Sequence, residues 1–224
     1  MSTNLYIPNS VFLEKNNTLG IWLSGGADSS ILCYLLARHI KENNLKFKIQ
    51  PVTVLKRIGD TCHLDVLNFI KKELDCTDMF LDIIVHDTSN KQEYDDSFFN
   101  VRLEHVVEGK YKYIYSGINQ SPDEEAYTNG WKMAQEVQEI RGSTITKLKI
   151  LCGVIELDGS DYEFGDIRPF MMMDKKEIAN IYKQYDLLDN LFPLTNSCGG
   201  HSPANTHCKK CWNCRERLWA FSKF

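Results

Sequence analysis

The chain has 224 residues, 43% of them hydrophobic and 25% charged, and its formal net charge at pH 7 is −4. This length and composition fit a soluble α/β domain with a sizeable core, and the acidic balance argues against tight, nonspecific nucleic-acid binding. Residues 1–17 lack the basic start and apolar core of a signal sequence, and no apolar run is long enough to span a bilayer. We therefore expect a cytoplasmic protein without a membrane partner.

The first predicted element is a strand that ends in a glycine-rich loop and leads into a helix. The apolar run 19–23 stops at Ser24, two glycines follow, and apolar residues in 28–40 recur at three- and four-residue spacing. Glycines let several backbone N–H groups converge on one anion, and a helix N-terminus favours phosphate. The loop lacks the Gly-Lys-Ser/Thr of a Walker A motif, so it predicts a different phosphate cradle; the alternative is a plain turn capped by Asp28 or Ser29. The candidate cradle comprises Ser24, Gly25, Gly26, Ala27, Asp28, Ser29 and Ser30.

Strands and helices alternate over the next part of the chain. After the first strand and helix, strands are predicted at 46–55, 80–85 and 111–116, and helices at 63–74 and 94–107. This alternation predicts an α/β fold with a Rossmann-like parallel sheet, right-handed crossovers and helices on both faces.

The pattern is less regular after the fourth strand. A helix is predicted at 127–141, a last strand or an apolar helix segment at 148–155, and a polar loop at 157–164. We place a domain boundary near Pro169, between a core at 1–169 and a smaller C-terminal lobe at 170–224.

A polar loop begins at Gly117, where the predicted fourth strand ends, and it contains Asn119. Three acidic residues follow in 123–125. Their carboxylates either hold Mg²⁺ through oxygen ligands or complement the dipole of a following helix, and both interpretations stay open. The acidic residues are Asp123, Glu124 and Glu125.

Asp174 and Glu177 have the spacing of a capping box and predict a helix N-terminus. Lys175 would lie on its first turn. Beside the phosphate cradle, its ammonium would neutralise charge developing on a phosphate; the alternative is a solvated lysine on a helix face.

The eight cysteines fall into two groups. Four are scattered through regular segments, whereas Cys198, Cys208, Cys211 and Cys214 lie close together, and the last three are separated by two-residue spacers. Such spacers let successive thiolates bind one ion, so the group predicts a closed, structural Zn²⁺ site. A redox or sulfur-carrying role and an iron–sulfur cluster are the alternatives.

The segment Ser24-Gly25-Gly26-Ala27-Asp28-Ser29 resembles the pyrophosphate-binding loop, or PP-loop, of the N-type ATP pyrophosphatases, whose fold is adenine nucleotide alpha-hydrolase-like. The resemblance implies attack by a substrate oxygen on the α-phosphate of ATP, release of pyrophosphate, and displacement of AMP by a nucleophile such as ammonia. It also implies that Asp28 helps to place Mg²⁺. The Gly-x-Asn stretch at Gly117 and Asn119 would lie near the nucleotide.

The order of motifs is similar to that of the 7-cyano-7-deazaguanine synthases of queuosine biosynthesis. The PP-loop is followed by Lys175-Lys176-Glu177-Ile178, then Ser197-Cys198, and then the Cys-x-x-Cys-x-x-Cys run from Cys208 to Cys214. This resemblance implies an ATP-dependent C–N ligase that uses ATP, Mg²⁺ and Zn²⁺. Its substrates would be ammonia and a deazapurine carboxylate, 7-carboxy-7-deazaguanine, which is converted through an amide to the nitrile. It implies Lys175 and Asp28 as catalytic residues, and a homodimer.

Segments 56–60 and 119–127 depart from that family's pattern, and both face the substrate in it. Two rival hypotheses therefore remain. One is a tRNA-thiolating PP-loop enzyme, which would need a redox-accessible cysteine and a basic RNA-binding face. The other is a non-catalytic ATP-binding sensor or assembly protein, which would release no AMP.

Overall fold

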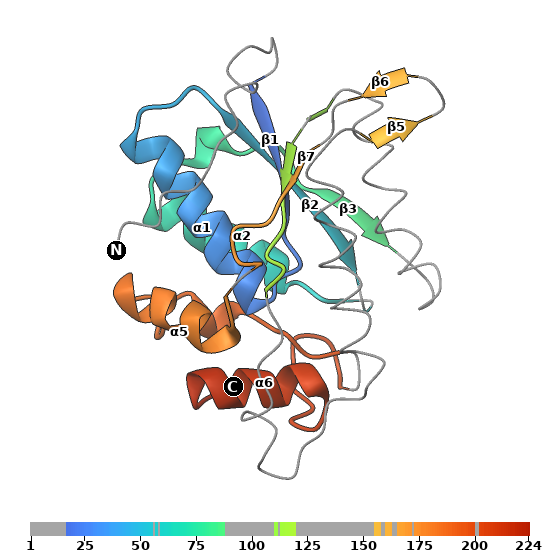
Figure 1. The fold of residues 1–224 in the computed structure, drawn as a ribbon. Helices are drawn as coiled ribbons and strands as arrows, with labels where there is room; N and C mark the ends of the chain where they lie inside the picture. Colours follow the sequence, from blue (N-terminus) through green and yellow to red (C-terminus); the bar gives the residue numbers. More distant parts are fainter. Residues whose placement is uncertain are drawn as a thin grey trace.

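The structure is a computed structural model that describes residues 17–55, 57, 59–87, 110–111, 113–119, 155–157, 160–162, 165–171, 173–199 and 202–224. Its elements follow one another along the chain as shown in Figure 1. They are β1 (Thr18–Trp22), α1 (Ala27–Glu42), β2 (Lys48–Leu55), α2 (Cys62–Glu73), η2 (Thr77–Met79), β3 (Ile84–Asp87), β4 (Tyr113–Tyr115), β5 (Ile155–Leu157), β6 (Ser160–Tyr162), β7 (Gly165–Ile167), α5 (Lys175–Gln184), η4 (Phe192–Leu194) and α6 (Trp212–Phe221).

A five-stranded parallel sheet in the order β3-β2-β1-β4-β7 forms the centre of the fold. The chain winds from β1 through β2 to β3 on one side, and β4 then pairs with the opposite side of β1. The strand order therefore reverses between β1 and β4. In open α/β sheets, ligands bind in the crevice at this switch point, beyond the carboxyl ends of the strands.

One continuous hydrophobic cluster joins the sheet to the helices. It contains Leu19 and Ile21 of β1, the apolar face of α1, and Tyr182, Phe192 and Phe221 from the C-terminal part. These three aromatic rings pack against one another, with centroids 4.1–5.6 Å apart. Full burial of such a side chain contributes about 1.5–3 kcal/mol, so the C-terminal helices are held firmly to the sheet domain. Figure 1 shows α5 and α6 stacked beneath α1. The boundary near Pro169 stays a prediction.

The opposite face of the sheet carries a smaller cluster, formed by Trp22, Val52, Val54, Tyr111 and Ile114. The helix predicted at 94–107 lies outside the described residues, as do the helix predicted at 127–141 and the acidic residues of 123–125. Among the described helices, none combines the length and the apolar character needed to cross a membrane.

The strand predicted at 80–85 is displaced along the chain. Only Phe80 makes an isolated bridge to Ile49, and β3 itself begins at Ile84. The cause lies in β2, where the backbone N–H groups of successive residues point alternately to the two neighbouring strands. The N–H of Lys48 points to the β1 side, so the nitrogen of Pro51, an odd number of residues later, faces β3. A proline nitrogen has no hydrogen to donate, so the pairing with β3 is interrupted there. The Gln50 side chain donates to the Asp82 carbonyl at 2.6 Å instead.

The end of the sheet also differs from the prediction. The last strand is β7 at 165–167, and it pairs with β4; of the segment 148–155 only Ile155 is described, and it begins β5. The predicted polar loop at 157–164 contains β6, which forms an antiparallel pair with β5. Strands β5, β6 and β7 are each three residues long. A strand of this length is too short for a period-two pattern to be recognised in the sequence.

Candidate functional site

The glycine-rich loop lies between β1 and α1 at the switch point. Its Gly25 has φ +75°, and a Cβ there would lie 2.7 Å from the backbone nitrogen of His63, so the position excludes larger residues. Gly26 is the N-cap of α1 and makes no side-chain capping bond. The interpretation of the loop as a turn capped by Asp28 or Ser29 is therefore wrong. The first N–H of α1, that of Ala27, donates to Ser197 Oγ at the long distance of 3.4 Å, and a bound anion would compete for this donor.

The two serines of the first turn of α1 point back to the loop. Ser29 Oγ and Ser30 Oγ both donate to the Gly26 carbonyl, at 3.1 and 2.7 Å, and Ser24 Oγ lies 3.0 Å from Ser29 Oγ. These bonds fix the backbone of the loop, so that its N–H groups do not have to be ordered when a ligand binds.

The segment after β4 closes the other side of the crevice. A Cβ on Gly117 would lie 2.8 Å from the backbone of Asp28 and Ser29, so only glycine allows this close approach. Asn119 is buried, and its Nδ2 has no hydrogen-bond partner among the described residues. Between the two segments lies a cavity of about 140 Å³, lined by Trp22, Ser24, Gly26, Asp28, Ser29, Ser116, Gly117 and Ile118.

Lys175 reaches the same crevice from the first turn of α5. The capping box is confirmed: Glu177 N donates to Asp174 Oδ1 at 2.9 Å, and Asp174 N donates to Glu177 Oε2 at 2.8 Å. The side chain of Lys175 is buried, and its ammonium pairs with the Asp28 carboxylate and lies 3.6 Å from Glu216 Oε2. It is therefore not a solvated lysine. Asp28 Oδ1 is buried without a hydrogen-bond partner in the described part of the chain, as expected for an oxygen that can bind Mg²⁺.

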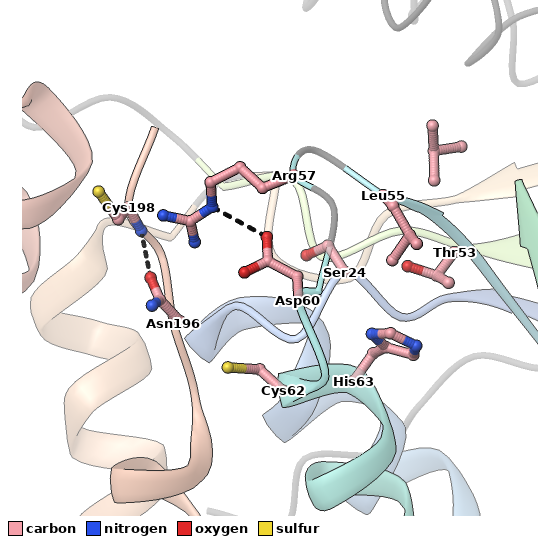
Figure 2. Close-up of a pocket in the computed structure, with 10 residues that line it drawn as sticks. Ser24, Thr53, Leu55, Arg57, Asp60, Cys62, His63, Asn196 and Cys198 are labelled. Atoms are coloured by element: carbon pink, nitrogen blue, oxygen red, sulfur yellow. Dashed lines mark hydrogen bonds and ion pairs between the residues drawn. The ribbon is translucent and has the colours of Figure 1, made fainter. Parts of the chain in front are cut away.

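A second, smaller cavity of about 20 Å³ lies on the other side of the loop, between the end of β2, the N-terminus of α2 and the C-terminal segment (Figure 2). Arg57 pairs with Asp60 at 3.0 Å across it. Burial lowers the pKa of His63 and raises the pKa of the Cys62 thiol, so both side chains are neutral at pH 7. Arg57 and Asp60 lie in the segment 56–60, which faces the substrate in the family that the sequence resembles, whereas no role was predicted for Cys62 or His63.

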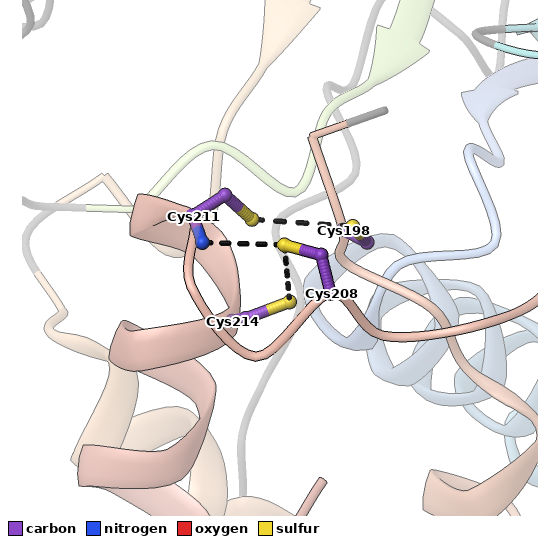
Figure 3. Close-up of side chains that lie close together, drawn as sticks. All are labelled: Cys198, Cys208, Cys211 and Cys214. Atoms are coloured by element: carbon purple, nitrogen blue, oxygen red, sulfur yellow. Dashed lines mark hydrogen bonds between the residues drawn. The ribbon is translucent and has the colours of Figure 1, made fainter. Parts of the chain in front are cut away.

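The four clustered cysteines converge on one point, as Figure 3 shows. Their Sγ atoms all lie within 4.8 Å of one another; Cys198 and Cys211 are 4.0 Å apart, and Cys208 and Cys214 are 3.9 Å apart. Sulfur ligands about 2.3 Å from one ion in a tetrahedron stand roughly 3.8 Å apart, so the set fits a single metal ion. Backbone N–H groups of Lys210 and Cys211 point to Cys208 Sγ, at 3.5 and 3.2 Å, and would stabilise a thiolate there.

Helix α6 links the cysteine cluster to the crevice. Cys214, Glu216 and Arg217 lie within four residues of one another; the first is in the cluster, and the second contacts Lys175. The Arg217 guanidinium is buried over the Phe192 ring at 3.7 Å and donates to Thr195 Oγ1 at 2.6 Å. Burial lowers its pKa to about 10, and it stays protonated at neutral pH.

One family model matches the C-terminal part of the chain. The family model of queuosine biosynthesis protein QueC matches residues 143–224. The matched segment contains Lys175, Glu216 and all four clustered cysteines. The glycine-rich loop at 24–30 precedes the matched segment and is not part of it. The resemblance to the 7-cyano-7-deazaguanine synthases is therefore confirmed over these residues. No curated protein sequence matches the chain.

Among solved structures, the U34-tRNA thiolase NcsA from Methanococcus maripaludis, with its [4Fe-4S] cluster, has a TM-score of 0.51 at 15% identity. The alignment covers 95% of this chain and 66% of the thiolase, so the chain spans about two thirds of the thiolase's length. This likeness shows a shared fold. The NH3-dependent NAD synthetase from Campylobacter jejuni subsp. jejuni NCTC 11168 aligns with a TM-score of 0.41 at 14% identity, over 82% of this chain and 70% of the synthetase. NMN synthetase from Francisella tularensis aligns with a TM-score of 0.42 at 12% identity, over 96% of this chain and 88% of the synthetase.

Proposed function

We propose that the chain is an ATP-dependent C–N ligase of the QueC type, which adenylylates a carboxylate and converts it with ammonia to an amide and then a nitrile. The observation that carries the proposal is the position of the QueC-matched segment. That segment brings Lys175 and the cysteine cluster to the same edge of the sheet as the PP-loop, which lies outside the match. Two independent signals thus converge on one crevice.

The chemistry follows from the charges around the loop. The carboxylate oxygen of 7-carboxy-7-deazaguanine attacks the α-phosphorus of ATP, and the bond to the β-phosphate oxygen breaks with release of pyrophosphate. Backbone N–H groups of 24–30 and the N-terminus of α1 would hold the departing pyrophosphate, and Lys175 would offset its charge. Asp28 Oδ1 is the oxygen that would help to hold Mg²⁺, which supplies further charge neutralisation when bound.

Ammonia then attacks the acyl carbon and AMP leaves, which gives the primary amide. A second ATP would adenylylate the amide oxygen, and loss of AMP with a proton would give the nitrile. Adenylylation depends mainly on position and charge, which the protein contributes. The protons released when ammonia attacks and when the nitrile forms would pass to excess ammonia and to water. Asn119, whose Nδ2 has no partner in the described part of the chain, is the candidate contact to the nucleotide or the substrate.

We assign Zn²⁺ to the cysteine cluster. In a [4Fe–4S] cluster each thiolate binds a different iron, which spreads the sulfur atoms further than ligands of one ion. The spacing of 3.9–4.0 Å between paired Sγ atoms supports the single ion, and four protein ligands leave no open position for chemistry. A thiolation reaction through one of these cysteines would dismantle the site.

The test is mass spectrometry of the products formed from 7-carboxy-7-deazaguanine, ATP, Mg²⁺ and ammonia. We expect the amide to appear first and the nitrile after it. When ammonia is omitted, we expect that neither product accumulates. If the deazapurine is returned unchanged while another carboxylate yields its amide, the ligase assignment stands and the substrate is wrong. Sulfur transfer to tRNA by the same preparation would favour the thiolase alternative instead.

A further inference from the structure

The segment Thr195–Cys198, which we call the bridge segment, contacts both the cysteine cluster and the PP-loop. Cys198 belongs to the cluster. The residue before it, Ser197, accepts a hydrogen bond from Ala27 N at 3.4 Å, and Asn196 N donates to the Gly25 carbonyl at 2.8 Å. Three consecutive residues therefore join the two sites, without an intervening flexible stretch.

The bridge segment is also stiffened from within and from α6. Asn196 Oδ1 accepts from Cys198 N at 2.8 Å, which fixes the turn that leads into the cluster. At the other end, Thr195 Oγ1 accepts from the buried Arg217 at 2.6 Å and donates to the Phe192 carbonyl at 2.7 Å. Arg217 lies one turn after Cys214, so two cluster cysteines are anchored to the two ends of the bridge segment.

Within the bridge segment, Ser197 and Asn196 lie against the glycine-rich loop. A Cβ built on Gly26 would lie 3.6 Å from Ser197 Oγ and 3.8 Å from the Asn196 carbonyl, so the bridge segment covers one side of the loop. When four thiolates are drawn to one ion, this cover is fixed. When the ion is absent, the segment keeps its hydrogen bonds and its packing but loses the anchor at Cys198, and part of its order must be regained when an anion binds the loop.

We propose that Zn²⁺ at the cysteine cluster and pyrophosphate at the PP-loop strengthen each other's binding, and that Ser197 is the positioning residue that couples them. The inference rests on the proposed function only in taking the loop as a pyrophosphate site. Linkage requires that the two effects be equal: the factor by which pyrophosphate raises zinc affinity is the factor by which zinc raises pyrophosphate affinity.

The experiment measures zinc affinity by competition with a chromophoric chelator, with and without inorganic pyrophosphate and Mg²⁺, on the full chain. Calorimetry gives pyrophosphate affinity for zinc-loaded and zinc-free protein. We expect an increase of about fivefold or more in both directions. Without pyrophosphate, Ser197→Ala should bind zinc with wild-type affinity, and pyrophosphate should change that affinity by less than about twofold. Ser197→Thr keeps the hydroxyl and should retain most of the coupling. Thr77→Ala, which removes an exposed hydroxyl in η2, serves as the matched control and should couple like the wild type.

The outcomes separate this proposal from the proposed function. If pyrophosphate binds the wild type but leaves zinc affinity unchanged, the coupling is wrong and the ligase assignment survives. Full coupling in Ser197→Ala, or loss of zinc from that variant without pyrophosphate, would overturn the role of Ser197. If zinc-loaded protein binds no pyrophosphate at all, the phosphate cradle fails, and the proposed function fails with it.

Discussion

Gly25→Ala tests the loop geometry most sharply, because two different costs act at that position. The φ of +75° is left-handed, which costs an alanine about 1–2 kcal/mol. The new Cβ would also lie 2.7 Å from the His63 nitrogen, about 0.7 Å short of the 3.4 Å where ordinary contact begins. Relieving such overlap against backbone typically costs about 1–3 kcal/mol, so the total destabilisation should reach about 2–5 kcal/mol.

Gly59→Ala is the matched control. Gly59 has φ +85°, but a Cβ there would meet only the Ala204 Cβ at 3.7 Å, which is ordinary contact. This variant should therefore lose only the backbone cost of about 1–2 kcal/mol. The difference between the two variants, about 1–3 kcal/mol, isolates the contact between the loop and α2.

Urea denaturation of the zinc-loaded proteins measures both variants, with the m-value as a check that the unfolding transition is unchanged. Pyrophosphate affinity should fall roughly ten- to hundredfold in Gly25→Ala, because displacement of the loop loses about one charge-assisted hydrogen bond of 1.5–3 kcal/mol. Equal destabilisation of Gly25→Ala and Gly59→Ala, with unchanged pyrophosphate binding, would refute the close packing of the loop on α2.

Three further predictions concern individual side chains. Lys175→Gln should lower the rate of AMP release about a hundredfold or more, because it removes the buried cation of the crevice. In the matched control Lys176→Gln, on the exposed side of α5, the rate of AMP release should stay within about twofold of the wild type. Cys214→Ser leaves three thiolates, so the purified protein should lose its stoichiometric metal, as atomic emission would show. Burial lowers the pKa of His63 below 6.5, so the unfolded state binds more protons, and stability should fall as the pH drops below about 6.5. Burial also lowers the pKa of His207, to about 4, so His63→Gln should reduce this slope and leave the part due to His207 in urea titrations between about pH 5 and pH 8.

The long elements of the fold could be predicted because their patterns extend over many residues. The apolar periodicity of α1 and the continuous buried run of β2 each place an element within a few residues of its observed bounds. The displacement of β3 could not be predicted, because it depends on which neighbour the Pro51 nitrogen faces. That direction is known only once β2 is placed between β1 and β3.

The local parts of the candidate site could also be predicted from spacing. The capping box at Asp174 and the four-cysteine group are written into short stretches of sequence, and the structure brings each group together. Glu216 beside Lys175 was missed, since no sequence pattern connects side chains that only tertiary packing unites. Ser197 was missed as a loop contact for the same reason, although its position directly before Cys198 was a usable signal.

The central claim is that the loop at 24–30 holds the β- and γ-phosphates of ATP while the α-phosphorus is attacked. Phosphorus NMR of ATP turned over with Mg²⁺, ammonia and 7-carboxy-7-deazaguanine tests this directly. We predict AMP and pyrophosphate as the phosphorus products, with their formation dependent on the carboxylate. Formation of ADP and orthophosphate would contradict the claim.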